Sequence, residues 1–321
     1  MIVITGAAGF IGSCMAAKLN AAGNGQLLLV DDFSVDKKRR NWENKQYIDK
    51  IDREDFFKWA EKNYRHIDFI IHLGARTDTA ETRTEIFEHL NIDYSRRMWS
   101  LAVSKSIPLL YASSAATYGD GKYGYMDDTE TLKHIVPLNA YGKSKHLFDL
   151  WVAKQSKTPP YWAGFKFFNV YGPNEYHKGR MASVAFHAFH QIRETGTMKL
   201  FRSHKPEYTD GAQSRDFIYV KDITNVLLWF LEKPRQSGIY NLGTGFARTF
   251  LSLAHSVFSA MKLEPSVDFV DIPSDIREKY QYYTQADMKK MKSTGYRKPP
   301  HSLEKGINDY ITHYLGGDMI Y

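Results

Sequence analysis

Short apolar runs alternate with amphipathic stretches along the first half of the chain. The apolar runs are rich in Val, Ile, Leu and aromatic residues, as buried strands are, and the stretches between them repeat apolar positions with a helical period. This alternation predicts an α/β fold built on a doubly wound parallel sheet with helices on both faces. The predicted strands are residues 1–4, 26–30, 66–73, 107–113 and 161–168, and the predicted helices are residues 10–22, 53–64, 83–105 and 141–156.

The alternation becomes less regular after residue 169. A helical run at 183–194 and a charged loop at 202–214 come first, and GIYNLG at 238–243 is typical of one more strand that returns to the sheet. This order predicts a smaller lobe that is interleaved with the sheet. We expect a larger domain formed by residues 1–168 and about 216–245, and a smaller C-terminal lobe formed by about 169–215 and 246–321.

Composition and charge narrow the class of protein. The 321 residues are 43% apolar and 14% aromatic, which is ample for one large or two fused globular domains. No secretory signal or run of about 18 apolar residues is found, so we expect a cytoplasmic protein with no membrane segment. The single cysteine, Cys14, is expected in the core. The net charge of +7 favours anionic partners, but no basic stripe with interleaved aromatics indicates nucleic-acid binding, so we expect a small anionic ligand.

A glycine-rich turn follows the first predicted strand, in the sequence TGAAGFIGS at 5–13. Gly6 would permit the tight turn, Gly9 would let the backbone approach a pyrophosphate, and Gly12 would allow close packing of the following helix. Nineteen residues after Gly12, Asp31 ends the second strand, where an acidic residue contacts the adenosine ribose. Together these features predict that the larger domain binds a dinucleotide.

Basic residues just after Asp31 bear on which dinucleotide is bound. The run DKKRR occupies residues 36–40, and Arg53 follows. Lys38 and Arg53 could hold the 2′-phosphate of NADP through charge-assisted contacts, whereas Asp31 alone would favour NAD. We therefore expect tightly bound NADP, with NAD as the alternative and with no metal site.

A Tyr–Lys pair supplies candidate chemistry. Tyr141 and Lys145 are four residues apart and share one face of a predicted helix. A neighbouring ammonium and an oxidised nicotinamide would lower the pKa of a phenol toward neutrality. Ser114 follows the strand at 107–113, at a sheet edge where ligands bind, and could hydrogen-bond the hydroxyl that Tyr141 deprotonates. The three residues predict a hydride-transfer site.

Longer motifs now identify a family. The chain resembles the extended short-chain dehydrogenases/reductases that act on nucleotide sugars, through TGAAGFIG, HLGAR, YASSAATYG, YGKSK and FNVYGP in that order. Within the family it is more similar to the branch that epimerises carbon 6 of ADP-heptoses for lipopolysaccharide synthesis. That closer likeness rests on HKGRMASVAFH at 177–187, KLF at 199–201, SRDFIYVKD at 214–222, NLGTG at 241–245 and YQYYTQAD at 280–287.

The resemblance implies roles for individual residues. It implies that Tyr141, Lys145 and Ser114 are catalytic, that Lys178 is a second acid/base, and that the protein is a homo-oligomer acting on an ADP-sugar. The implied cofactor-binding residues are Gly6, Gly9, Phe10, Ile11, Gly12, Asp31, Asp32, Lys38, Arg53, Leu73, Gly74, Ala75, Arg76, Thr77, Lys145, Val170 and Lys178. The implied substrate-binding residues are Ser114, Asn169, Arg180, His187, Phe201, Arg202, Ser203, His204, Arg215 and Tyr280, with Arg215 suited to the diphosphate and Phe201 to adenine.

Two arginines depart from the family pattern. Arg180 replaces a small residue and Arg76 follows the HLGA stretch, so both are expected to add positive charge close to the substrate. This bears on the identity of the sugar, and a 4-epimerase or dehydratase of another nucleotide sugar is the alternative enzyme. A nucleotide-sensing binding protein is the alternative of another class, although such a sensor would need none of Ser114, Tyr141 and Lys145.

Overall fold

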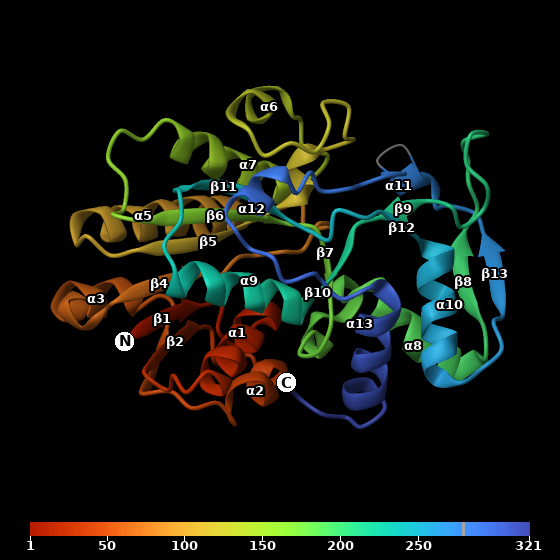
Figure 1. Ribbon diagram of the computed structural model, residues 1–321, viewed down its shortest axis with the longest axis horizontal. Helices are drawn as coiled ribbons and strands as arrows, with labels where there is room; N and C mark the ends of the chain where they lie inside the picture. The colour runs from red at the N-terminus through yellow and green to blue at the C-terminus, as the bar shows by residue number, and fades with distance from the viewer. Residues whose placement is uncertain (278–279) are drawn as a thin grey trace.

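A seven-stranded sheet in which every pair of neighbours is parallel forms the centre of the molecule (Figure 1). The computed structural model describes residues 1–277 and 280–321. The strand order is β11-β6-β5-β4-β1-β2-β3, which confirms the predicted doubly wound sheet and the return of 238–243 to it. The strands are β1 (Ile2–Thr5), β2 (Leu27–Asp31), β3 (Asp49–Asp52), β4 (Phe69–His72), β5 (Leu109–Ser114), β6 (Trp162–Phe167) and β11 (Gly238–Leu242).

Helices cover both faces of this sheet. Because successive side chains of a strand point to opposite faces, Val3 of β1 packs in one core and its neighbours Ile2 and Ile4 pack in another. The helices α3 (Phe56–Asn63), α5 (Tyr94–Ser104) and α7 (Ala140–Ala153) contribute to the first core, and α1 (Phe10–Ala21) and α9 (Val220–Glu232) contribute to the second. Within the described ranges, no helix combines the length and the apolarity needed to cross a bilayer.

The structure differs from the sequence-based expectation at β3 and at the predicted helix 83–105. The strand β3 was not predicted, because its sequence DKID is polar and it lies at the exposed edge of the sheet. The predicted helix at 83–105 consists of α4 (Thr84–Phe87), a π-helical segment (Glu88–Asp93) and α5. A π-helical turn changes which side chains face the sheet, and such turns are frequent at functional sites.

Smaller sheets and helices gather beyond the carboxyl edge of the large sheet (Figure 1). Their core contains Phe10 and the buried Cys14 from α1, so this part packs directly on the glycine-rich turn and Cys14 is in the core as expected. The paired strands are β7 (Asn169–Tyr171) with β10 (Phe217–Tyr219), β9 (Ser214–Arg215) with β12 (Arg248–Thr249), and β8 (Met198–Phe201) with β13 (Val267–Val270). The helices here include α8 (Val184–Thr195), α10 (Phe250–Met261), α11 (Ser274–Arg277), α13 (Leu303–Asp309) and a π-helical segment (Tyr310–Leu315). Short α-helices elsewhere are α2 (Arg39–Trp42), α6 (Thr129–His134) and α12 (Lys289–Ser293).

Candidate active site

The glycine-rich turn has the close backbone contacts that only glycine permits. Gly6 has a φ of 67°, and a Cβ on it would lie 2.7 Å from the Cα of Gly74. A Cβ on Gly12 would lie 2.0 Å from the carbonyl oxygen of Gly6. Gly9 caps α1 without a side-chain hydrogen bond, and the first turn of the helix has no acidic residue. The first N–H groups of α1 are therefore available to a phosphate, as the sequence predicts.

The predicted cations do lie at the end of β2, and each is paired with an aspartate. Lys38 Nζ lies 2.9 Å from Asp31 Oδ1, and the backbone N–H of Ala8 donates to Asp31 Oδ2 at 2.9 Å. A guanidinium nitrogen of Arg53 lies 3.5 Å from Asp32 Oδ2. Two positive and two negative side chains therefore meet where the adenosine end of a dinucleotide is expected.

The segment after β4 is held by Asn91, a residue that the sequence analysis did not single out. Asn91 Oδ1 accepts from the backbone N–H of Arg76 at 2.8 Å, and its Nδ2 donates to the carbonyl of Arg76 at 2.9 Å and to Ser144 Oγ at 2.8 Å. Asn91 lies in the π-helical segment, and Ser144 lies on α7 beside Lys145. One amide thus links the predicted cofactor segment to the helix that carries Tyr141.

Ser114, Tyr141 and Lys145 are brought together at the carboxyl end of β5. Lys145 is buried and donates to the carbonyl of Ala112 at 2.9 Å, which ties α7 to the strand. Burial lowers the pKa of Lys145 to about 8, while the negative charge of Asp149 acts to raise it. Burial raises the pKa of Tyr141, and a hydrogen bond with Ser114 opposes that rise. Ser114 and Tyr141 are therefore neighbours, at the sheet edge where both are expected to reach one substrate hydroxyl.

The pKa of Tyr141 differs in direction from the expectation. A lowered pKa was expected from Lys145 together with an oxidised nicotinamide, but burial dominates among the protein groups and raises it. A positive charge close to the phenol would stabilise the phenolate, and its effect is largest in a buried site of low dielectric. The groups of the protein therefore do not by themselves lower the pKa of Tyr141.

Lys178 lies in a 3₁₀-helical loop, Tyr176–Met181, that follows β7. Its Nζ is 5.4 Å from the centre of the Phe10 ring at the start of α1, so two predicted cofactor-binding residues meet. Burial lowers the pKa of Lys178, as expected for a proton-exchanging lysine, and the charge of Glu175 opposes this. Glu175 is itself buried and accepts from Ser183 Oγ at 2.7 Å, which anchors the loop.

Arg76 and Arg180, which are expected to add positive charge close to the substrate, are both paired with carboxylates. A guanidinium nitrogen of Arg180 lies 3.2 Å from Asp78 Oδ2, and Arg76 lies 3.3 Å from Glu81 and 3.5 Å from Asp78. Asp78 thus bridges two arginines that are about a hundred positions apart in the chain. Nearby carboxylates offset both charges, which the local sequence around either arginine does not reveal.

Three predicted substrate-binding residues form one cluster, the Arg215 cluster, made of Phe201, Arg215 and Tyr280. The Arg215 guanidinium lies 5.5 Å from the centre of the Tyr280 ring, and the rings of Phe201 and Tyr280 meet edge to face at 5.8 Å. Arg215 is only 8% exposed, and it donates to the carbonyls of Ser214 and Gln281. Those carbonyls fix the orientation of the guanidinium.

Tyr282, whose ring meets that of Tyr280 edge to face at 5.7 Å, connects two other predicted substrate-binding residues to the Arg215 cluster. The Tyr282 hydroxyl accepts from the backbone N–H of His204 at 2.9 Å and from Ser203 Oγ at 3.3 Å. Asn169 Nδ2 donates to Thr284 Oγ1 at 3.3 Å. Arg202, which follows Phe201 directly, lies 3.6 Å from Asp271, and His187 is exposed on α8 with its ring beside Phe186.

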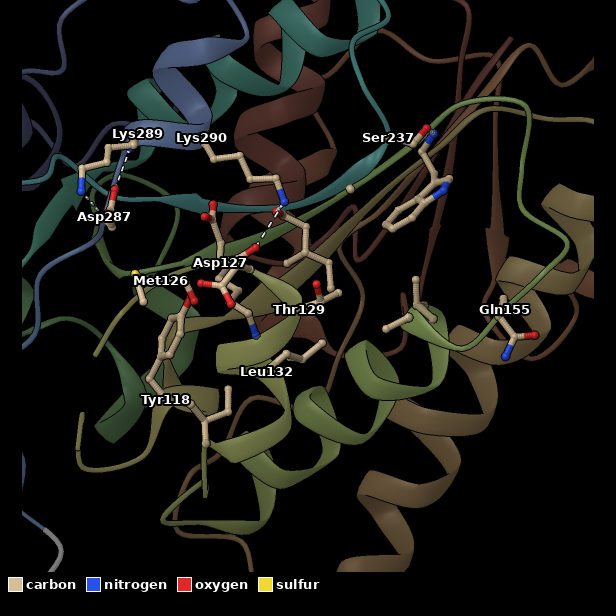
Figure 2. Close-up of a pocket in the computed structure, with 18 of the residues that line it drawn as sticks. Tyr118, Met126, Asp127, Thr129, Leu132, Gln155, Ser237, Asp287, Lys289 and Lys290 are labelled. Carbon is tan, nitrogen blue, oxygen red and sulfur yellow. Dashed lines mark hydrogen bonds and ion pairs between the residues drawn. The ribbon is translucent and has the colours of Figure 1, made fainter. Parts of the chain in front are cut away.

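A cavity of about 600 Å³ lies beside β11, the edge strand at the opposite end of the sheet from β3, and its lining includes neither Tyr141 nor Ser114 (Figure 2). Two of its polar side chains bind edge-strand backbone: Lys290 Nζ donates to the carbonyl of Ile239 at 2.7 Å, and Asp127 Oδ2 accepts from the N–H of Asn241 at 2.7 Å. These contacts use backbone groups that an edge strand otherwise exposes. Among residues 1–277 and 280–321, no cluster of His, Cys, Asp or Glu could hold a metal ion.

Hydride transfer to a nicotinamide requires a pyrophosphate-binding turn and a proton acceptor near the same edge of the sheet. At the carboxyl edge, this chain has a glycine-rich turn after β1 and a tyrosine, Tyr141, beside the end of β5. It therefore has the architecture of a dinucleotide-dependent enzyme. Residues 2–243 match the model of the NAD dependent epimerase/dehydratase family, and the chain belongs to that family.

Individual relatives are similar over their full length. The ADP-L-glycero-D-manno-heptose-6-epimerase of Fusobacterium nucleatum is 43% identical, with all of both chains covered, and that of Nitratidesulfovibrio vulgaris is 43% identical over 98% of each. Among solved structures, the Helicobacter pylori enzyme of the same name superposes with a TM-score of 0.81 at 27% identity, covering 97% of this chain and 95% of that one. A UDP-N-acetylglucosamine 4-epimerase from Methanobrevibacter ruminantium has a TM-score of 0.84 at 21% identity, covering 99% and 98%, which shows the shared fold.

Proposed function

We propose that this protein converts ADP-D-glycero-D-manno-heptose into ADP-L-glycero-D-manno-heptose by oxidising carbon 6 and reducing it again. The supporting observation is that Ser114, Tyr141 and Lys145 meet at one site in a chain whose full-length relatives bear that name. The same reaction accounts for Lys178, a second lysine whose pKa is lowered by burial, because inversion needs proton transfer on two faces of the carbonyl. We place the protein in the cytoplasm as a homo-oligomer.

The residues around the glycine-rich turn fit a dinucleotide. Gly6, Gly9 and Gly12 keep the turn free of side chains, and the uncapped start of α1 offers N–H groups to the pyrophosphate. NADP, the cofactor that we propose, would supply the hydride acceptor and donor. Lys38 and Arg53 would hold its 2′-phosphate.

The proposed catalytic and substrate-binding residues each have a defined task in this reaction. Tyr141 takes the proton of the carbon 6 hydroxyl, which Ser114 orients, and Lys145 holds a positive charge that favours the phenolate. Lys178 exchanges the proton after the oxidised sugar has turned to present its other face. The Arg215 cluster holds the ADP part, with Arg215 at the diphosphate and Phe201 at adenine.

We further propose that the two groups of elements divide this work, with the large sheet binding the cofactor and the smaller lobe binding the substrate. The cofactor-binding part would consist of residues 1–168 and about 216–245, and the substrate-binding part of about 169–215 and 246–321. The Arg215 cluster and Lys178 come from strands and loops beyond the carboxyl edge of the large sheet. Substrate and cofactor would meet where those loops lie over α1.

The direct test is incubation of the purified protein with ADP-D-glycero-D-manno-heptose, followed by NMR of the product at carbon 6. The L-glycero epimer is the expected product. Turnover of UDP-sugars without conversion of the heptose would instead assign a 4-epimerase or dehydratase. Binding of NADP with no turnover of any nucleotide sugar would assign a binding protein, and identifying the nucleotide released on denaturation would settle the cofactor.

Lys38→Ala combined with Arg53→Ala should weaken NADP binding far more than NAD binding. Only NADP loses charge-assisted contacts to its 2′-phosphate, which corresponds to about 1–3 kcal/mol, or roughly 5- to 150-fold in Kd. Titration of both nucleotides by calorimetry measures the ratio. Arg39→Ala with Arg40→Ala is the matched control, since these arginines belong to the same basic run but pair with Glu43 and Asp318. Equal losses for NADP and NAD would contradict the assignment.

Epimerisation in D₂O should leave no deuterium at the inverted carbon and release no reduced nucleotide. The hydrogen removed from carbon 6 is returned to the same carbon, so it does not exchange with solvent. Mass spectrometry of the product and absorbance at the reduced-nicotinamide band measure the two quantities. Stoichiometric release of reduced nucleotide would mean that the protein is a dehydrogenase.

A further inference from the structure

A buried ion pair lies directly behind the proposed catalytic lysine. Asp149 is 0% exposed and Lys166 is 1% exposed, and Lys166 Nζ lies 2.6 Å from Asp149 Oδ2. Asp149 is four residues after Lys145 on α7, so both point to the same face of the helix. Its carboxylate also accepts from Ser113 Oγ at 2.6 Å and from the Tyr111 hydroxyl at 3.2 Å. Both carboxylate oxygens are therefore hydrogen-bonded.

The pair is connected to Ser114 through a single hydroxyl. Lys166 Nζ donates to Thr117 Oγ1 at 2.8 Å, and Thr117 Oγ1 donates to the carbonyl of Ser114 at 2.8 Å. Lys145 donates to the carbonyl of Ala112, two residues before Ser114. The end of β5 is thus attached to α7 and β6 at consecutive positions, and these bonds set where the Ser114 hydroxyl and the Lys145 ammonium lie relative to each other.

Stability alone does not account for this pair. Removing two charges from water costs several kcal/mol for each ion, and replacing a buried pair by apolar residues of similar volume is often neutral or stabilising. A leucine and a methionine would fill the space of Asp149 and Lys166. They could not hold the hydroxyls of Ser113 and Thr117 in fixed directions. The ion pair specifically orients these two hydroxyls and places a negative charge beside Lys145.

We propose that Asp149 and Lys166 are positioning residues that hold Lys145 and the Ser114 turn in place for proton transfer. The inference rests on the proposed function for the identity of the reaction. It assigns a task to two residues outside the Ser–Tyr–Lys group, and both act through that group.

The electrostatic part of this task depends on the groups that face Lys145. Asp149 is the anion beside it, on the same helix, and Lys166 on β6 partly offsets that anion. From β4, His72 is buried, and this burial lowers its pKa to about 3, so the imidazole is neutral. Tyr141 on α7 and Tyr111 on β5 are neutral phenols, because burial raises the pKa of each. Asp149 supplies the negative charge that raises the pKa of Lys145, so without this carboxylate Lys145 would lose its proton at lower pH.

Asp149→Asn is the informative substitution, since the amide keeps the shape and removes the charge. In the full chain loaded with its cofactor, we expect the alkaline limb of the pH profile of kcat to move down by about one pH unit. We also expect kcat at pH 8 to fall about 10- to 100-fold with KM for the ADP-sugar nearly unchanged. Lys166→Arg, made in the wild-type chain, preserves the ion pair with Asp149 and should keep the wild-type profile.

Thr117→Val separates positioning from charge and is expected to fold, because valine matches threonine in shape. It removes the bond from Lys166 to the Ser114 turn while leaving every charge in place. We expect a roughly 3- to 10-fold lower kcat, from the loss of one buried hydrogen bond, with no shift in the pH profile. Asp309→Asn is the matched control: Asp309 also accepts from a lysine and a tyrosine at 2.6 Å, but it lies on α13 and should leave the profile unchanged.

Amide hydrogen exchange of residues 112–118 gives a readout that needs no substrate. Exchange should be faster in Asp149→Asn and Thr117→Val than in the wild type, and normal in Lys166→Arg and Asp309→Asn. The inference would be overturned if Asp149→Asn kept the wild-type pH profile of kcat, Thr117→Val kept the wild-type kcat, and both kept wild-type exchange rates. A loss of thermal stability with none of these changes would also overturn it. If Asp149→Asn does not fold, Thr117→Val decides the question by the same readouts. If the wild type leaves ADP-heptose unchanged while the exchange pattern holds, the proposed function fails and the positioning role stands.

Discussion

Tyr141→Phe and Lys178→Met should each reduce inversion at carbon 6 by about 10²- to 10⁴-fold while leaving the nucleotide bound. The reasoning starts from the fixed position of the hydride-transferring ring, which requires the oxidised sugar to turn before it is reduced on its other face. Turning moves the carbonyl oxygen away from its first proton donor. A second group must then serve the opposite side, and Lys178 beside Phe10 at the start of α1 is the candidate.

Half-reactions show whether the two residues divide the work in this way. An aldehyde analogue at carbon 6, which carries its own oxidising and reducing equivalents, should be disproportionated by the wild type. Each single variant should retain part of this activity, with a preference for one configuration, since one proton-transfer group remains. Lys143→Met is the matched control, because Lys143 is an exposed lysine on the helix of Tyr141. Epimerisation by Lys178→Met at the wild-type rate would show that Tyr141 serves both faces.

Gly12→Ala should displace the glycine-rich turn and remove most of the bound cofactor. The added methyl group would lie 2.0 Å from the carbonyl oxygen of Gly6, and neither atom can move without shifting backbone. Overpacking of this kind costs about 3 kcal/mol, which corresponds to roughly a 100-fold loss in cofactor affinity if the turn opens to relieve it. The nucleotide content of the purified protein and its thermal unfolding measure the effect.

Gly25→Ala is the matched control for this substitution. A Cβ on Gly25 would meet only the flexible side chain of Gln46, at 3.6 Å, so stability should change by less than about 0.5 kcal/mol and the cofactor should stay bound. If Gly12→Ala kept wild-type nucleotide content, the close packing of α1 on the turn would not be what shapes the binding site.

Much of the framework could be predicted because its causes are local in sequence. Strands buried on both faces must be continuously apolar, so β1, β2, β4, β5 and β6 were recognisable. The strand β3 was not, since an edge strand with polar residues lacks that signature. The π-helical turn that holds Asn91 was missed as well, because a change in helical pitch over six residues hardly alters the apolar periodicity.

The sequence by itself determined the chemistry that depends on spacing within one turn or one helix. The glycine spacing before α1 and the four-residue interval from Tyr141 to Lys145 place groups together whatever the rest of the chain does. Only the tertiary structure decided which charges compensate one another. Asp78 pairs with Arg180, about a hundred positions later in the chain, and Asp149 on α7 pairs with Lys166 on β6. The physical reason is that ion pairs form between side chains close in space, and packing of the helices on the sheet sets those distances, which no local pattern encodes.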